Sequence, residues 1–196
     1  MTEMKYKLTE ETINVDGRTL HRIEALKDFG DVKKGDKGGF IEKEDNLSQN
    51  GNCWVYDNAK VYDNAKVYGN AVVFGNAVVF DSAAIYDNAL VCDNVEVCNN
   101  ARIYGYGEVY NNAVVRDNTK VYGKARIFDD VEIYGNAEVY DKAEVCENAE
   151  VYGNAKIYGN ARVYCDTVVC DKAEVCGYSK IYGNAVICGN VKVCRK

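Results

Sequence analysis

The sequence predicts an all-β protein, a left-handed parallel β-helix that follows a small N-terminal β-hairpin cap. Each coil of the β-helix has three sides, and each side is one six-residue repeat, or hexad. Three observations lead to this prediction. Residues 55–192 repeat every six positions, through 23 hexads, without insertion or deletion. The first position is Val or Ile in all 23 hexads, and the fifth is a small or short residue, usually Ala. The chain contains no Pro, which would remove a ladder hydrogen bond inside a sheet.

Each hexad predicts one short strand and one corner. Position three is mostly Asp or Gly, and position four is Asn in 15 of the 23 hexads; these residues tolerate the left-handed backbone of a tight corner. Positions five, six, one and two form the strand, and alternation points five and one inward and six and two outward. Because inward aliphatic side chains fill the coil, we expect function to lie on the outer faces.

The coil of three hexads predicts which outward side chains stack on one another. One column at position two is a row of tyrosines: Tyr68, Tyr86, Tyr104, Tyr122, Tyr140 and Tyr158. Two interpretations of this column stay open. The rings either join neighbouring coils, or they form an aromatic surface that binds a partner.

A candidate apolar patch lies near the N-terminal end of another face. Its members are Trp54, Val72, Phe74 and Leu90. Contiguous apolar residues of this kind predict either cover by the cap or a surface for self-association. Down position six of two faces, basic and acidic residues largely alternate, which predicts supportive charge pairs between coils.

Residues 1–52 do not follow the repeat, and we expect them to form the N-terminal β cap, with the β-helix occupying residues 53–196. Residues 13–20 predict a hairpin, because Asp16 and Gly17 supply the two positive-φ positions of a type I′ turn. Residues 33–39, rich in Gly, Lys and Asp, predict a loop. Such a cap covers the apolar side chains and strand edges at the end of a stack.

Composition argues against several classes of protein. A net charge of −6 disfavours a nucleic-acid-binding surface. No apolar run approaches the roughly 20 residues that a membrane-spanning helix needs, so we expect no membrane span. The N-terminus lacks the apolar core of a secretory signal, so we expect a cytoplasmic location.

The nine cysteines of an unsignalled chain favour free thiols over a disulfide framework. The coil nevertheless stacks Cys170 on Cys188 and Cys176 on Cys194, at a distance compatible with disulfides. The cysteines form no Cys-x-x-Cys pair, so we assign no metal site. The single histidine, His21, falls in the predicted hairpin and is expected to be a surface or packing residue.

The repeat Val-Tyr-Gly-Asn-Ala resembles the hexapeptide-repeat superfamily, whose left-handed β-helices include many acetyltransferases. Residues 28–33 (DFGDVK), 38–41 (GGFI) and 46–54 (NLSQNGNCW) are similar to the N-terminal signature of the YdcK-like family, which is described as transferases. The resemblance implies the fold and, as one alternative, acyl transfer. The chain departs from the acyltransferase pattern, because those enzymes usually carry a protruding loop and a catalytic His, and the 23 hexads carry neither.

The sequence therefore favours a non-catalytic scaffold that binds a protein partner, or another copy of itself, through its outer faces. On this interpretation no catalytic or cofactor-binding residue is assigned. The alternative is an acyl-CoA-dependent acyltransferase with acetyl-CoA as the donor. A third possibility, a mimic of DNA, is disfavoured by the Lys and Arg residues interleaved with the acidic ones.

Overall fold

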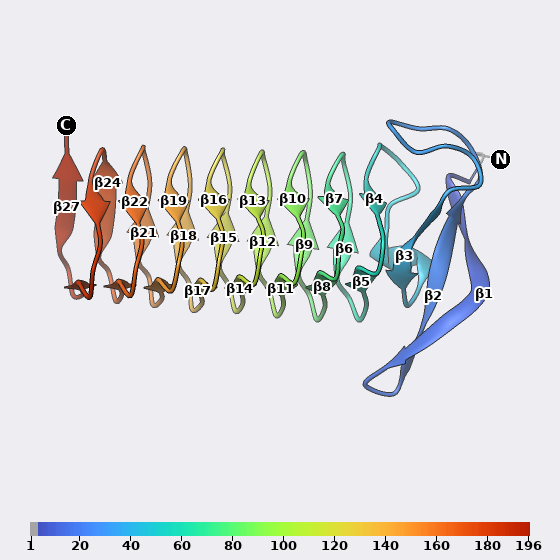
Figure 1. Cartoon of the computed structure of the whole chain (residues 1–196), viewed down its shortest axis with the longest axis horizontal. Coiled ribbons are helices and arrows are strands. Elements are labelled where there is room, and N and C mark those ends of the chain that lie inside the picture. The colour runs from blue at the N-terminus through green and yellow to red at the C-terminus, as the bar shows by residue number, and fades with distance from the viewer. Residues whose placement is uncertain (1–3) are drawn as a thin grey trace.

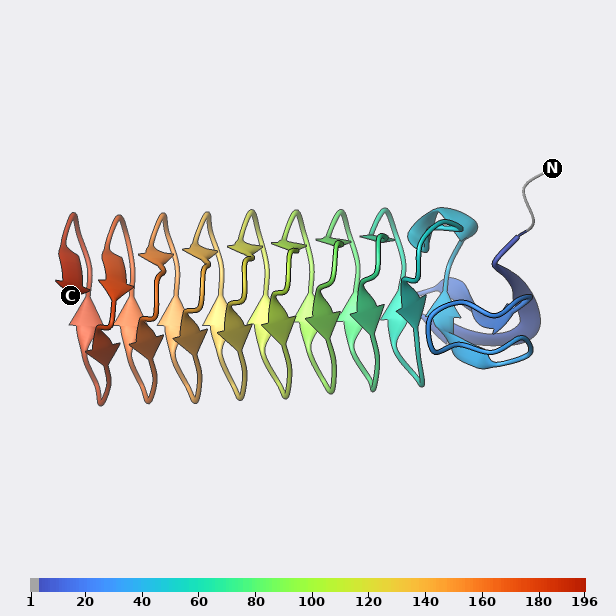
Figure 2. The same ribbon diagram turned by 90° about the horizontal axis from the view of Figure 1, so that it is seen from above.

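A computed structural model describes residues 4–196 and shows a β-solenoid whose coils stack along one axis, with a hairpin at the N-terminal end (Figure 1). The view turned by 90° shows the same regular row of coils (Figure 2). Within the repeat, a strand pairs in parallel with the strands three hexads before and after it, as Val121 does with Ile103 and Val139. The predicted fold class is confirmed. Residues 1–3 lie outside the described residues. They belong to the N-terminal segment in which we expect no secretory signal.

The strands form three sheets. The hairpin sheet has 11 strands: β1 (Tyr6–Val15), β2 (Arg18–Ala25), β3 (Lys37–Ile41), β5 (Lys60–Val61), β8 (Val78–Val79), β11 (Glu96–Val97), β14 (Val114–Val115), β17 (Glu132–Ile133), β20 (Glu150–Val151), β23 (Val168–Val169) and β26 (Val186–Ile187). The tyrosine sheet consists of β6 (Lys66–Val67), β9 (Ala84–Ile85), β12 (Arg102–Ile103), β15 (Lys120–Val121), β18 (Glu138–Val139), β21 (Lys156–Ile157), β24 (Glu174–Gly177) and β27 (Lys192–Arg195). The third sheet consists of β4 (Trp54–Val55), β7 (Val72–Val73), β10 (Leu90–Val91), β13 (Glu108–Val109), β16 (Arg126–Ile127), β19 (Glu144–Val145), β22 (Arg162–Val163) and β25 (Lys180–Ile181).

The interior is filled by the inward positions of the hexads. Val121, Ile103 and Ala125 are all completely buried, as are nearly all of their counterparts in other coils. Burying a Val or Ile contributes about 1.5–3 kcal/mol. Thr119 takes a small-residue position, and its hydroxyl donates to the Arg116 carbonyl oxygen at 2.7 Å, so its polar atom is satisfied inside the coil.

The corners are held by position three of the hexad. Asp117 and Asp141 both have positive φ, at 63° and 62°. Their carboxylates accept hydrogen bonds from the backbone N–H one coil further on: Asp117 from Gly135 at 2.8 Å and Asp141 from Gly159 at 3.1 Å. Turn geometry and this contact between coils account for the corner aspartates.

The cap is an antiparallel hairpin of β1 and β2 joined through the predicted turn, where Asp16 and Gly17 have φ of 50° and 80°. The loop predicted for residues 33–39 is wrong over its last three residues, which open strand β3. Gly38 fits there because the backbone packs closely: a Cβ at this position would lie 2.5 Å from the Val55 carbonyl oxygen.

The register of the first coil is irregular. Val55 pairs with Val73 at the regular spacing of three hexads. Ile41 pairs with Val61, and an isolated bridge pairs Leu47 with Val67; both of these spacings are longer by two positions. Two extra residues therefore lie between Leu47 and Val55. The parallel ladder reaches back to β3, and the division of the chain at residue 53 stays a prediction.

The helical content of the described residues is slight. The short 3₁₀ segment η1 (Glu44–Asn46) lies in the first coil. Across residues 4–196, no helix has the length and apolar character needed to cross a bilayer.

Candidate functional site

The six predicted tyrosines form one continuous stack on the tyrosine sheet, which we call the tyrosine ladder (Tyr68, Tyr86, Tyr104, Tyr122, Tyr140 and Tyr158). Neighbouring ring centroids lie 4.8–5.0 Å apart, and neighbouring planes are within 1–5° of parallel. Each ring therefore covers the face of the next. The ladder presents ring edges and a row of hydroxyl groups to the outside, and not the flat ring faces.

Charged side chains of the adjacent position-six column contact two of the ladder hydroxyls, those of Tyr122 and Tyr158. The Tyr122 hydroxyl donates to Glu138 at 3.5 Å, and Lys120 donates to the same carboxylate at 2.9 Å. Glu138 sits 16 residues beyond Tyr122, so it belongs to the next coil. The same offset recurs on the hairpin sheet, where the Tyr134 hydroxyl donates to Glu150 at 3.5 Å.

Burial favours the protonated form of four ladder hydroxyls, those of Tyr86, Tyr104, Tyr122 and Tyr140. Burial, followed by the Glu138 carboxylate, raises the pKa of Tyr122 well above its ordinary value of 10.0. Burial likewise raises the pKa of Tyr86, Tyr104 and Tyr140. At neutral pH these four hydroxyls are therefore neutral donors and acceptors beside a column of mostly charged side chains.

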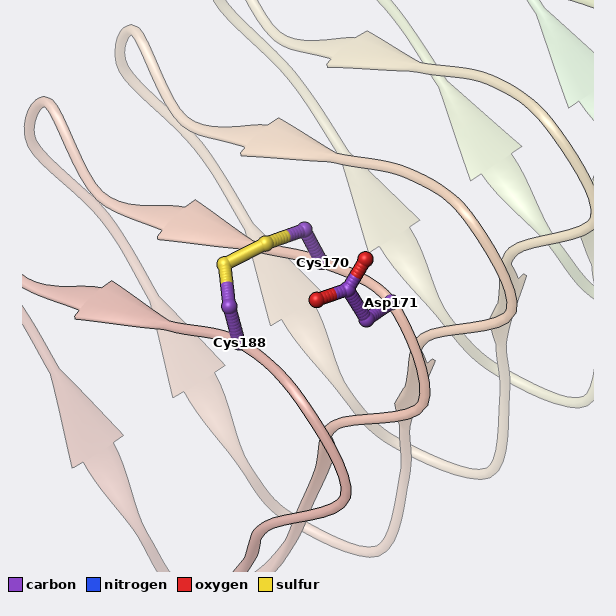
Figure 3. A group of neighbouring side chains, drawn as sticks. All are labelled: Cys170, Asp171 and Cys188. Carbon is purple, nitrogen blue, oxygen red and sulfur yellow. A yellow bond between two sulfur atoms is a disulfide. The ribbon is translucent and has the colours of Figure 1, made fainter.

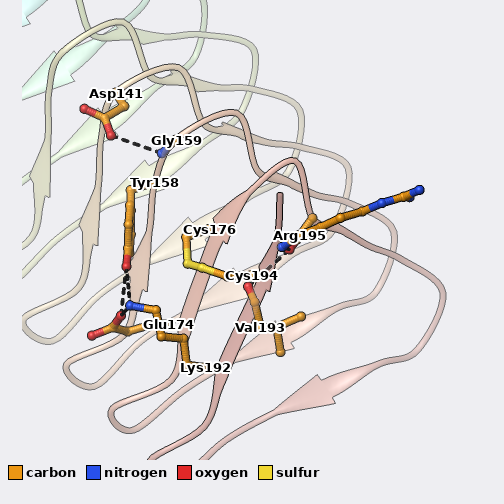
Figure 4. The surroundings of a disulfide bond; sticks show 10 residues. Asp141, Tyr158, Gly159, Glu174, Cys176, Lys192, Val193, Cys194 and Arg195 are labelled. Atoms are coloured by element: carbon orange, nitrogen blue, oxygen red, sulfur yellow. Dashed lines mark hydrogen bonds and ion pairs between the residues drawn. A yellow bond between two sulfur atoms is a disulfide. The ribbon is translucent and has the colours of Figure 1, made fainter.

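A disulfide continues the ladder column beyond Tyr158. Cys176 and Cys194, with Cα atoms 4.6 Å apart, are bonded to each other in the two coils that follow Tyr158 (Figure 4). Cys170 and Cys188 on the hairpin sheet are bonded in the same way, with a Cα separation of 4.7 Å. The expectation of free thiols is wrong for these four cysteines, because the register brings each pair within disulfide range. The free cysteines are Cys53, Cys92, Cys98, Cys146 and Cys165.

One group of potential metal ligands lies at the Cys170–Cys188 disulfide. The ligand atoms of Cys170, Asp171 and Cys188 are within 4.8 Å of one another (Figure 3). Both sulfurs are engaged in the disulfide, and the Asp171 carboxylate accepts a hydrogen bond from the Gly189 N–H at 3.0 Å. Since the thiolate is the form of cysteine that binds metals, this bonded pair does not offer a metal centre.

The candidate apolar patch is divided by the cap. Trp54 is completely buried and meets Tyr6 and Phe29 edge to face, with centroids 6.0 and 5.3 Å away. Cover by the cap, one of the two alternatives left open, therefore applies to Trp54. Val72, Phe74 and Leu90 are half-buried, and an interaction role for them stays a prediction.

Two further polar groups belong to the cap. The His21 ring lies on β2, with Nδ1 3.1 Å from the Thr9 carbonyl oxygen. Lys5, which sequence reasoning did not single out, is buried: its Nζ donates to the Cys53 carbonyl oxygen at 2.9 Å and lies 3.3 Å from Cys53 Sγ. Burial lowers the pKa of Lys5. No local sequence pattern predicts this contact between Lys5 and Cys53, because the contact depends on the irregular first coil.

Comparison with known proteins agrees with the repeat geometry. The profile described as YdcK β-solenoid repeat matches residues 65–81 and 155–171. A curated protein from Escherichia coli (strain K12), "Uncharacterized acetyltransferase YdcK", is 44% identical over 61 residues. That alignment covers 27% of this chain and 19% of the relative. The match therefore concerns a minor part of each protein. The chain is a β-solenoid, and its residues 65–81 and 155–171 are similar to the YdcK β-solenoid repeat.

Proposed function

We propose that the protein is a non-catalytic scaffold whose outer faces, and the tyrosine ladder above all, bind a protein partner or a second copy of the chain. The interior is occupied by Val, Ile and Ala side chains, so recognition falls to the outer columns. The ladder is the observation that supports the proposal: six stacked tyrosine rings whose neighbouring centroids lie 4.8–5.0 Å apart.

The composition of the ladder suits an interface. A tyrosine combines a large apolar body with a polar tip, and tyrosine is enriched among residues that dominate binding energy. Stacking has already ordered the rings, so little side-chain freedom remains to be lost on association. The flanking charges, such as Lys120 and Glu138, would fix the orientation of the partner more than its affinity.

The test removes the hydroxyls and keeps the stack. A variant carrying Tyr104→Phe, Tyr122→Phe and Tyr140→Phe is compared with wild type in a pull-down from host lysate, with untagged wild type as competitor. We expect a partner that the competitor displaces and the triple variant captures weakly. Equal capture by both proteins would exclude the ladder. Sedimentation velocity tests the second copy: a strict monomer at high concentration removes self-association.

An acyl-CoA-dependent acyltransferase is the second candidate, and the name of the Escherichia coli relative is what favours it. The donor would be acetyl-CoA. Acyl transfer needs a general base within hydrogen-bond reach of its proton, and the only histidine is His21 of the cap. Calorimetry with acetyl-CoA separates the candidates, since saturable micromolar binding would contradict a purely structural role.

A further inference from the structure

The position-two column of the third sheet is interrupted at Cys146. Tyr110 and Phe128 are stacked with centroids 5.1 Å apart, and Tyr164 and Tyr182 are stacked 5.5 Å apart. Between these pairs stands Cys146, whose side chain is too short to replace a ring. Because strands lie about 4.8 Å apart, Phe128 and Tyr164 flank a gap roughly two strand spacings wide.

The gap is an open cavity on the surface. Its volume is about 260 Å³, and its walls include Phe128 and Tyr164 on either side, with Cys146 between them. We call it the Cys146 slot. In the ladders of this protein a ring occupies one coil and lies about 4.9 Å from each neighbour. The slot therefore has the thickness of one aromatic ring.

The register also predicts which charged groups surround a ring placed in the slot. The Tyr158 hydroxyl contacts Glu174 and Lys192, which are 16 and 34 residues further on, both at 2.9 Å. The first offset also holds for Tyr110, whose hydroxyl oxygen accepts a hydrogen bond from Arg126, 16 residues further on, at 2.7 Å.

Counted from Cys146, the same two offsets give Arg162 and Lys180, and both line the cavity. Two cations therefore face the place that the outer substituent of a ring in this slot would occupy. Arg162 is 54% exposed and pairs with Glu144 at 3.0 Å. Glu144 also lies 3.5 Å from Arg126, which offsets its charge. Lys180 is exposed and makes no side-chain hydrogen bond or ion pair within residues 4–196.

We propose that the Cys146 slot binds a single-ring aromatic carboxylate, with the ring stacked between Phe128 and Tyr164 and the carboxylate held by Arg162 and Lys180. The guanidinium of Arg162 matches the geometry of a carboxylate through two parallel hydrogen bonds. The site is on a different face from the tyrosine ladder and does not depend on the scaffold proposal.

The floor of the slot suits an aromatic ring. Burial, followed by the Glu147 carboxylate, raises the pKa of the Cys146 thiol to about 11. The sulfur is therefore neutral at pH 7, and contacts between sulfur and aromatic rings are favourable. Glu147, exposed at the corner of the cavity, disfavours a ligand with a second negative charge.

A second gap in the same column lacks this arrangement. Cys92 stands between Phe74 and Tyr110, three coils earlier, and is only 6% exposed. Counted from Cys92, the two offsets lead to Glu108 and to Arg126, which already binds Tyr110. Of these two gaps in the column, only the Cys146 slot is faced by two cations that bind no tyrosine of that column.

Ligand-observed NMR and calorimetry on the full chain test the proposal, with 4-hydroxybenzoate as the probe. We expect saturable binding that is abolished by Cys146→Tyr, which supplies the missing ring, and retained by Cys146→Ser. Lys180→Gln should weaken binding about tenfold, through the loss of one charge-assisted hydrogen bond, and Arg162→Gln should weaken it at least as much, because it removes two. Lys192→Gln, the equivalent change beside the filled position at Tyr158, should leave the affinity unchanged.

Three outcomes would overturn the site. These are no saturable binding to wild type, binding retained by a folded Cys146→Tyr variant, and equal affinity for uncharged 4-hydroxybenzamide. If Cys146→Tyr lowers the melting temperature, the two cation variants decide the question, because their exposed side chains can change without disturbing the core.

Discussion

The Tyr158 hydroxyl donates to Glu174 at 2.9 Å and accepts from Lys192 at 2.9 Å, while Lys192 also donates to Glu174 at 2.7 Å (Figure 4). Tyr158 directly follows β21, Glu174 opens β24, and Lys192 opens β27. One ring thus connects three consecutive coils outside the core, at the end where the tyrosine ladder meets the Cys176–Cys194 disulfide.

Lys192→Met should raise the pKa of Glu174. The hydrogen bond from Lys192, and then that from Tyr158, holds this pKa below its usual 4.5. A depressed carboxyl pKa contributes stability that is present above the unfolded-state value and is lost as pH falls through the folded-state value. NMR titration should therefore show a Glu174 midpoint below 4.5 in wild type that moves up toward 4.5 in the variant. Lys172→Met is the control, and an unchanged midpoint would refute the assignment.

Tyr104→Ala should destabilise the protein far more than Tyr182→Ala. Tyr104 has ring neighbours 4.9 Å away on both faces, whereas Tyr182 has one at 5.5 Å and is 62% exposed. Each stacked pair contributes about 0.5–1.5 kcal/mol beyond the area that it buries. Urea unfolding monitored by circular dichroism should separate the two variants by roughly 2 kcal/mol. Equal losses would mean that stacking within the ladder adds little.

Asp141→Ala should be destabilising, and Asp141→Asn nearly neutral. Alanine removes the acceptor for the Gly159 N–H and must adopt a φ of 62°. The lost hydrogen bond costs about 1 kcal/mol, and the left-handed backbone costs alanine about 1–2 kcal/mol more. Asparagine keeps an acceptor oxygen and tolerates that backbone. Thermal unfolding of both variants gives the comparison, and similar melting temperatures would contradict this role of the corner.

Reduction of the two disulfides should loosen the C-terminal coil. Each closes a sequence separation of 18, and a loop of about 15 residues is worth roughly 3 kcal/mol in the chain-entropy account. Hydrogen exchange should accelerate in β26 and β27 on adding reductant, with β12 as the internal control. Alkylation of unfolded, unreduced protein should modify five of the nine cysteines. Modification of all nine would show that the pairs are not bonded.

Much of the fold could be predicted because the hexad specifies it locally. Val121 and Ala125 point inward, Asp117 forms a corner, and Asp16-Gly17 forms the hairpin turn. The first coil could not be predicted in the same way. Its two extra residues move Leu47 out of the frame of the repeat, so its pairing with Val67 is visible only in three dimensions.

The sequence predicts which residues stack in each outer column, but it does not predict how their side chains are oriented. The period of three hexads places Tyr86 above Tyr68, and it places Cys176 above Tyr158. It does not show that the rings lie parallel and hide one another's faces. It also does not show that Cys146, one residue in a largely aromatic column, opens a cavity, because that depends on how far the side chains of Phe128, Arg162 and Tyr164 fill the space around it.

The interior and the outer surface of this molecule repeat with different periods. The core repeats with every hexad, since each one presents Val or Ile and usually Ala, whereas the outer columns align only after every third hexad. Removing one hexad would leave the packing of the interior almost unaltered, yet it would transfer every later side chain to the adjacent face and cut the tyrosine ladder in two. Only the gain or loss of whole coils preserves both sides, so the length of such a protein can change in steps of three hexads while its surfaces keep their identity.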